Sequence, residues 1–263
     1  MYATCPVCGH RRKRPEEPAT TCPACGLVFE KWLRRQLREA NPEPEPEPRE
    51  AGLVGGHAGA LVAHVLACAR HVEPRVNPVV WLGRVAVWVG LLVWGAWFAS
   101  TDHRELVAGL PEVNGSFMHA VNLAFHEAGH ILFSLLGDFM GVLGGSLLQL
   151  LMPLIVAGTF VLRHGNPFGG SVGLWWAGQS AVDLAPYVAD ARSQSMILLG
   201  GVLGRERPGY HDWNNLLGRL DLLGLDHTLG FLTHWGGVLT MALALLWGAW
   251  LLRAQFHNLD RRF

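Results

Sequence analysis

Two histidines and a glutamate stand in the pattern His126-Glu127-Ala128-Gly129-His130, inside an apolar stretch of the chain. On a helix, residues i and i+4 project from one face, so both imidazoles can reach one metal ion. The glutamate between them can then act as general base on a metal-bound water. Ionisable side chains in an apolar segment are costly unless they are partnered. We therefore interpret the pattern as a catalytic zinc site; the alternative is a helix whose histidines are satisfied by neighbouring groups.

A catalytic zinc ion takes three protein ligands and keeps one position for water. Asp183 is the most deeply embedded candidate for the third ligand, one helical turn after Gln179, to which it could instead be hydrogen-bonded. Asp190 follows a proline-interrupted segment, where unwound backbone can hold a carboxylate at membrane depth. His211 and Asp212 are the remaining candidates for the third ligand; they lie in a polar stretch that is most simply a loop or a helix N-cap but can fold back over the site. We take these two residues and Gln179 as candidate groups around the metal.

Four cysteines form two CPxCG pairs, Cys5 with Cys8 and Cys22 with Cys25. Four thiolates from two tight turns make a closed tetrahedral zinc site, and the glycine after each pair eases the turn. Because all four coordination positions are filled, we expect a structural zinc ribbon or docking module. A pair of disulfides is the alternative. The first thirty residues are polar and lack the pattern of a signal peptide, and this argues against disulfides, which form in secreted proteins.

The elements that must position these groups are mostly apolar helices. Half of the residues are hydrophobic and 16% are charged, whereas about a quarter are charged in an ordinary soluble domain. We expect a mainly α fold, a polytopic membrane helix bundle over residues 79–263. About five spans are predicted by apolar segments long enough for a bilayer, at 79–100, 116–137, 139–162, 167–185 and 229–252.

The region before the bundle divides into three parts after the ribbon at residues 1–30. Residues 31–40 predict a short basic helix, and 41–48 (NPEPEPEP) predict an extended proline- and glutamate-rich linker. Residues 51–70 predict a helix that is soluble, interfacial or a weak span, and their glycines and histidines favour the membrane interface. The expected location of the whole chain is the cytoplasmic membrane, with the ribbon on the cytoplasmic side. A net charge of zero argues against nucleic acid as a partner.

The HEAGH helix, the uncharged span after it and the proline-interrupted segment ending in an aspartate resemble a known family. They are similar to the site-2 protease family of intramembrane zinc metalloproteases, over residues 116–200. The resemblance implies that His126, His130 and Asp190 bind zinc. It also implies that Glu127 is the catalytic base.

Two positions depart from the family pattern. Asp183 stands where the family usually has asparagine, and Ala191 stands where it usually has glycine. Asp190 is thus favoured as third ligand by its position in the pattern, and Asp183 by its embedding in the apolar segment.

The expected function is hydrolysis of a peptide bond in a membrane-anchored protein, with one catalytic and one structural Zn²⁺. The expected partners are that substrate, the lipid bilayer and a cytoplasmic protein at the ribbon. Two other functions compete with this one. The same site could support metal-assisted hydrolysis of another substrate, or the chain could be a non-catalytic membrane scaffold or regulator that binds a partner through its ribbon.

Overall fold

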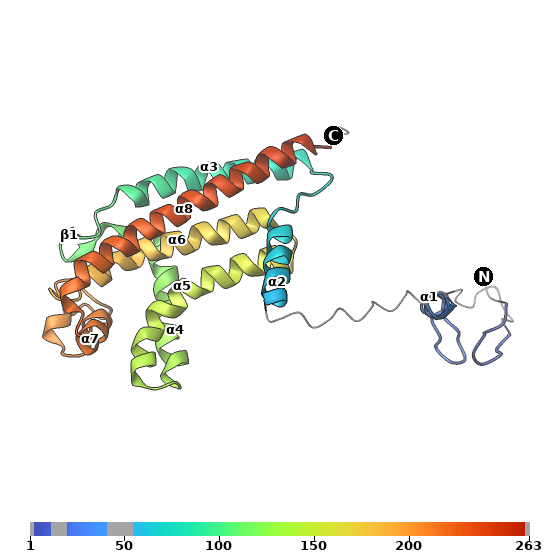
Figure 1. Ribbon diagram of the computed structural model, residues 1–263, viewed down its shortest axis with the longest axis horizontal. Coiled ribbons are helices and arrows are strands. Elements are labelled where there is room, and N and C mark those ends of the chain that lie inside the picture. The colour runs from blue at the N-terminus through green and yellow to red at the C-terminus, as the bar shows by residue number, and fades with distance from the viewer. Residues whose placement is uncertain (1–2, 12–19, 41–54, 261–263) are drawn as a thin grey trace. The chain divides into compact units, whose positions relative to one another are not determined.

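The computed structural model describes residues 3–11, 20–40 and 55–260. The chain separates into two compact units, residues 1–58 and 59–263 (Figure 1). The predicted linker at 41–48 lies outside the described residues.

The smaller unit contains two cysteine turns and a helix, α1 (Phe29–Ala40). Each turn is closed by an isolated antiparallel bridge, Thr4 with Arg11 and Thr21 with Val28. The basic helix expected at 31–40 is present as α1, and an exposed pair four residues apart, Glu30 with Arg34 at 2.6 Å, lies along it. Such an exposed pair contributes only about 0.3–0.5 kcal/mol.

The larger unit is a bundle of helices, with its longest connection between α6 and α7. Its helices are α2 (Gly55–Ala69, which belongs to this unit from Gly59 on), α3 (Pro78–Ser100), α4 (Phe117–Ser134), α5 (Asp138–Leu162), α6 (Pro167–Ala189), α7 (Asp212–Arg219) and α8 (Asp226–His257). Two strands, β1 (Leu106–Val107) and β2 (Leu110–Pro111), form an antiparallel hairpin between α3 and α4. Single 3-10 turns are η1 (Glu112–Gly115), η2 (Gly204–Glu206) and η3 (Leu223–Leu225).

Local sequence explains where several of these helices begin. Asn77 precedes a proline and accepts a hydrogen bond from the Val79 amide at 2.8 Å, so α3 starts at Pro78. Ser116 caps α4 in the same way, accepting from the Met118 amide at 3.3 Å. The cap fixes the first turn of the helix that carries the HEAGH motif.

Three helices in the described part of the chain are long and apolar enough to cross a membrane: Pro78–Ser100, Asp138–Leu162 and Leu223–His257. They correspond to three of the five predicted spans. The other two predicted spans do form helices, α4 and α6, but both fall outside this group. The first candidate span leaves most of its apolar surface uncovered by the rest of the chain, as expected for a lipid-facing helix.

Helix α6 lies at the centre of the bundle, which explains why it carries polar residues and small residues. Figure 1 shows α6 beside α8, and these two helices form the most extensive contact of the fold. Their backbones approach closely at Gly178 and Gly237, where an added Cβ on either glycine would lie within 2.6 Å of the other's carbonyl oxygen. A helix enclosed by protein needs less apolar surface than one enclosed by lipid. The lower hydropathy of α6 therefore follows from its burial.

The segment between α2 and α3 packs onto the helix bundle of the larger unit. Backbone at Val76 pairs with Asn258, and the Trp247 indole donates to the Ala69 carbonyl at 3.1 Å. Glu73 forms a bidentate pair with Arg84 at 2.8 and 3.0 Å. These contacts attach the segment before α3 to the helix bundle. A sequence boundary drawn from hydropathy alone misses such polar contacts.

Candidate metal centres

The two HEAGH histidines lie on one face of α4, next to α5. The two helices cross closely there because Gly129 lies against Gly144: a Cβ at Gly129 would be 2.1 Å from the Gly144 carbonyl oxygen. Gly145, the residue after Gly144 on α5, leaves the space in front of both imidazoles open. A Cβ at Gly145 would lie 2.5 Å from Nε2 of His130 and 2.7 Å from Nε2 of His126. The glycines of α4 and α5 thus create the room that a bound ion needs.

Each imidazole is held by a hydrogen bond at Nδ1. His126 Nδ1 lies 2.9 Å from Oε1 of Gln149, and His130 Nδ1 lies 2.8 Å from the carbonyl oxygen of Gly141. An amide or carbonyl oxygen can only accept, so Nδ1 carries the proton in both rings. In a neutral imidazole the lone pair then sits on Nε2, the atom that faces the space beside Gly145.

Asp212, at the start of α7, supplies the third group. Its Oδ2 lies 3.0 Å from Nε2 of His126 and 3.2 Å from Nε2 of His130. Burial disfavours the ionised form of Asp212, but hydrogen bonds from the two imidazoles outweigh it and lower its pKa to about 2. The two Nε2 atoms and Asp212 Oδ2 all carry lone pairs and would repel one another if no positive charge lay between them. This arrangement therefore requires either protons or a cation.

The three residues His126, His130 and Asp212 form a cluster, here called the His2Asp site, whose ligand atoms all lie within 4.8 Å of one another. Two imidazoles and one carboxylate are a ligand set that a catalytic zinc ion accepts.

Contacts on both sides of Asp212 hold it in place. Its backbone amide donates to the Tyr187 hydroxyl at 2.8 Å, and the next residue, Trp213, donates through its indole to Ser146 of α5 at 3.1 Å. The preceding residue, His211, caps α7 by accepting from the Asn214 amide. The polar stretch, the least favoured of the three candidate sources of a third ligand, therefore brings a carboxylate onto the two histidines.

Asp190, predicted from the family pattern as third ligand, is not part of this cluster. It ends α6, and its carboxylate accepts from the backbone amides of Ser195 and Met196, each at 2.9 Å, and from the Ser193 hydroxyl. Its Oδ2 also lies 3.4 Å from Nε2 of His211. Asp190 thus organises the loop that leads from α6 to α7. In this structure the third position beside the histidines belongs to Asp212.

Asp183, the alternative third ligand, is buried in the bundle and is likewise absent from the cluster. Its Oδ1 lies 3.0 Å from Nδ1 of His119, and its Oδ2 accepts from the amides of Asn122 at 3.1 Å and Gln149 at 3.3 Å. Gln179, its expected partner, instead accepts from Asn122 at 3.1 Å. Asp183, Gln149 and His119 line the same cavity as Glu127 and the His2Asp site, so the carboxylate lies near the three candidate ligands without joining them.

Glu127 lines a cavity of about 280 Å³ together with the His2Asp site. Its other walls mix polar groups, such as His119 and Tyr187, with apolar side chains, such as Leu123 and Leu198. The motif's glutamate and the three candidate ligands therefore face one space.

Sequence reasoning missed two residues that shape the site. Gln149 was overlooked because it lies in an uncharged helix; a lone amide in such a helix is itself a signal of a polar contact. Gly145 carries no signal in the sequence, because its position in front of the imidazoles depends on how α5 packs against α4.

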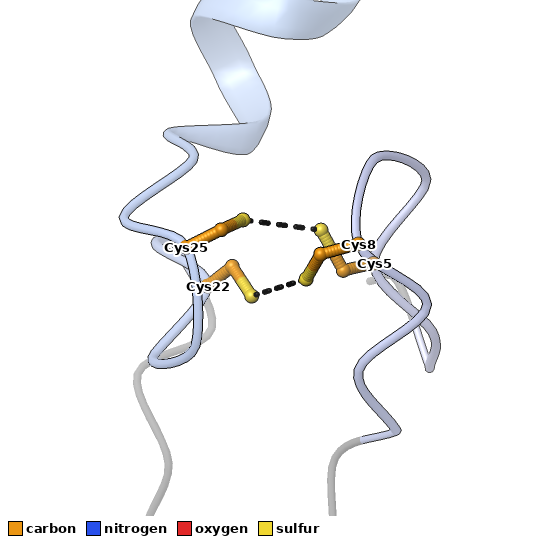
Figure 2. A group of neighbouring side chains, drawn as sticks. All are labelled: Cys5, Cys8, Cys22 and Cys25. Atoms are coloured by element: carbon orange, nitrogen blue, oxygen red, sulfur yellow. Dashed lines mark hydrogen bonds between the residues drawn. The ribbon is translucent and has the colours of Figure 1, made fainter.

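The four cysteines of the smaller unit form a second cluster, here called the four-cysteine site. Figure 2 shows the four sulfur atoms directed toward one another. Cys5 Sγ lies 3.8 Å from Cys25 Sγ, and Cys8 Sγ lies 3.6 Å from Cys22 Sγ. These distances are those of free thiols, and no disulfide joins them. The expected grouping of the four residues is confirmed, and the cluster can hold a metal ion.

The two cysteine turns have the same backbone. The amides of Gly9 and Gly26 donate to the carbonyls of Cys5 and Cys22, and both glycines have φ of +72°. This left-handed conformation favours glycine, which explains the residue after each CPxC.

The thiols of the four-cysteine site cannot all ionise easily without a cation. The Cys8 amide lowers the pKa of Cys5 to about 6. The Leu27 amide favours the Cys25 thiolate, but hydrogen bonding with the neighbouring thiols and burial outweigh it and raise the pKa of Cys25 to about 12. A divalent cation would remove this repulsion.

Comparison of the chain with protein-family models, curated proteins and solved structures found no match.

Proposed function

We propose that this protein is an intramembrane zinc metalloprotease that hydrolyses a peptide bond of a membrane-anchored protein. The observation that carries the proposal is the convergence of His126, His130 and Asp212 on the wall of the cavity that Glu127 also lines. A base beside a metal site with room for water is the arrangement that metal-assisted hydrolysis needs.

The residues would divide the chemistry as follows. A zinc ion held by the His2Asp site would keep one position for water and lower the pKa of that water toward 7. Glu127 would accept the water's proton and pass it to the leaving amine. The apolar wall, which includes Leu123 and Leu198, would hold a short stretch of unwound peptide and exclude bulk water.

The candidate spans support a substrate that is itself anchored in the membrane. Helix α5 is a candidate span and packs directly against α4, so the His2Asp site lies beside it. A substrate that arrives within the bilayer would reach this face of α4 without crossing a soluble domain. We further propose that the four-cysteine site holds a structural zinc ion and docks a cytoplasmic protein, with the protein located in the cytoplasmic membrane.

Replacing Glu127 by alanine tests the proposal. The probe is a panel of single-span peptides reconstituted with the full-length protein in lipid vesicles, with products read by mass spectrometry. We expect Glu127→Ala to lower the cleavage rate by about 10²–10⁴-fold, the usual contribution of a general base, while zinc remains bound. Glu112→Ala is the control, because Glu112 is exposed and lies outside the cavity. Equal cleavage by wild type and Glu127→Ala, or no cleavage of the panel by wild type, contradicts the proposal.

A further inference from the structure

A buried carboxylate is connected to the His2Asp site through a single amide. Asp183 accepts from Gln149 Nε2 at 3.3 Å, and Gln149 Oε1 faces His126 Nδ1 at 2.9 Å. All three side chains are buried. Neither Asp183 nor Gln149 has a role in the proposed reaction itself, so their connection to His126 calls for an explanation.

The carboxylate determines which way round the amide of Gln149 lies. An ionised carboxylate only accepts hydrogen bonds, so it must face the NH₂ group of the amide. The carbonyl oxygen of Ser180, also only an acceptor, lies 3.4 Å from the same Gln149 Nε2. With two acceptors around its nitrogen, the Gln149 amide can direct only its oxygen toward His126.

The amide in turn determines the tautomer of His126. Because Gln149 Oε1 can only accept, its hydrogen bond with His126 requires the proton on Nδ1. Asp212 Oδ2, 3.0 Å from Nε2, is the competing acceptor, and a metal ion bound at Nε2 would remove that competition. The lone pair is then on Nε2, the atom that faces Asp212. If the amide were reversed, its NH₂ group would donate to Nδ1, which would then need a lone pair. The proton of the ring would be on Nε2, where it would block metal binding.

The two histidines are fixed by different means. His130 Nδ1 bonds directly to a backbone oxygen, that of Gly141, which cannot reverse. His126 instead bonds to a side-chain amide, which can rotate and exchange its oxygen for its nitrogen. The site therefore needs a further group to fix the amide, and Asp183 is placed to do so.

We propose that Asp183 is a positioning residue of the His2Asp site: through Gln149 it fixes the Nδ1–H tautomer of His126, so that Nε2 can bind the metal. The inference rests on the metal site of the proposed function and deepens it. Other donors to the Asp183 carboxylate, from His119 and Asn122, bring its total to three, which suits an ionised group.

Zinc affinity of the full-length protein tests this role, measured by competition with a chelator. Gln149→Leu and Asp183→Leu should weaken zinc binding at the His2Asp site by about 10–100-fold, the usual effect of losing a group that orients a metal ligand. Asp183→Asn should rescue most of the affinity, because its amide oxygen can still accept from Gln149. The zinc of the four-cysteine site, in the other unit, serves as internal reference and should not change.

Ser180→Ala is the matched control. It removes the hydrogen bond from the Ser180 hydroxyl to the backbone carbonyl of Gln149 at 3.1 Å and leaves the side-chain amide untouched. Zinc affinity should therefore stay within about twofold of wild type, since no ligand is reoriented. A purely structural role for this part of the bundle would predict similar losses in Ser180→Ala and Gln149→Leu, which would overturn the inference.

The imidazole ¹⁵N shifts of His126 report the tautomer directly, in metal-free Asp212→Ala protein, where no carboxylate competes for a proton on Nε2. We expect Nδ1–H in Asp212→Ala and a mixture of tautomers when Gln149→Leu is added. Unchanged zinc affinity in both leucine variants, or loss in Asp183→Asn as large as in Asp183→Leu, would overturn the inference while leaving the protease proposal intact. Conversely, weaker zinc binding in both leucine variants together with no peptide cleavage by wild type would contradict the protease proposal alone.

Discussion

Replacing Gly145 by alanine should abolish metal binding at the His2Asp site, although the substitution adds only one methyl group. The added Cβ would lie 2.5 Å from Nε2 and 2.6 Å from Cε1 of His130, and 2.7 Å from Nε2 of His126. Ordinary contacts begin at 3.4 Å. The two Nε2 atoms would have to retreat by about 0.9 and 0.7 Å, several times the roughly 0.2 Å tolerance of a metal–ligand distance.

The magnitude follows from the loss of at least one ligand. Disturbing a group that merely orients a ligand costs about 10–100-fold in affinity, so displacement of a ligand itself should cost about 100-fold or more. The assay is zinc content after dialysis against a weak chelator, followed by competition titration.

Gly158→Ala is the matched control on the same helix. Nothing lies within 4 Å of a Cβ at Gly158, and alanine is the better helix former by about 1 kcal/mol. This variant should fold at least as well as wild type and keep its zinc. Full zinc binding by Gly145→Ala would refute the reasoning, because the imidazoles would then not occupy the positions described.

Three further results are expected. Asp212→Ala should lose the metal of the His2Asp site, whereas Asp190→Asn should keep it with at most about tenfold weaker affinity. Zinc analysis of both variants checks this, and loss of the metal in Asp190→Asn alone would contradict the assignment of Asp212 as third ligand. Zinc affinity at the His2Asp site should fall as pH falls. Asp212 has its pKa lowered to about 2 and stays ionised, so protons compete only for the imidazoles; titration showing binding independent of pH between about 5 and 8 would argue against imidazole ligands. The double variant Cys5→Ser, Cys8→Ser should lose only the metal of the four-cysteine site. If elemental analysis showed that both metals were lost, the two sites would not be independent.

The pair of histidines could be predicted from the sequence because their geometry is local. Their i, i+4 spacing is enough to place His126 and His130 on one face once the segment is helical. The same holds for the cysteine turns, where each CPxCG fixes its own backbone. The three long apolar helices were also predictable, because length and hydropathy identify them without tertiary information.

The third group beside the histidines could not be predicted in the same way. Asp190 and Asp183 both follow the histidines by about sixty residues. The family pattern favoured Asp190 and hydropathy favoured Asp183, each over a residue in a polar loop. The loop from α6 to α7 returns over α4 because of tertiary contacts, which include the hydrogen bonds to Asp190 and the Tyr187 hydroxyl. A carboxylate was correctly expected near the site, but its identity depended on how that loop folds.

Helix α6, a predicted span outside the group of long apolar helices, illustrates a related limit. The helix is present, but hydropathy cannot distinguish an apolar helix that faces lipid from one that is covered by other helices. In α6 the polar residue Asp183 is buried against protein groups, which supply its hydrogen bonds.

Metal stoichiometry of the full-length protein tests the central claim most directly. Wild type should bind two zinc ions per chain, one at each cluster, and Asp212→Ala should bind one. A wild-type protein that carries only the cysteine-bound ion, or an Asp212→Ala variant that retains two, would contradict the assignment of a metal to His126, His130 and Asp212.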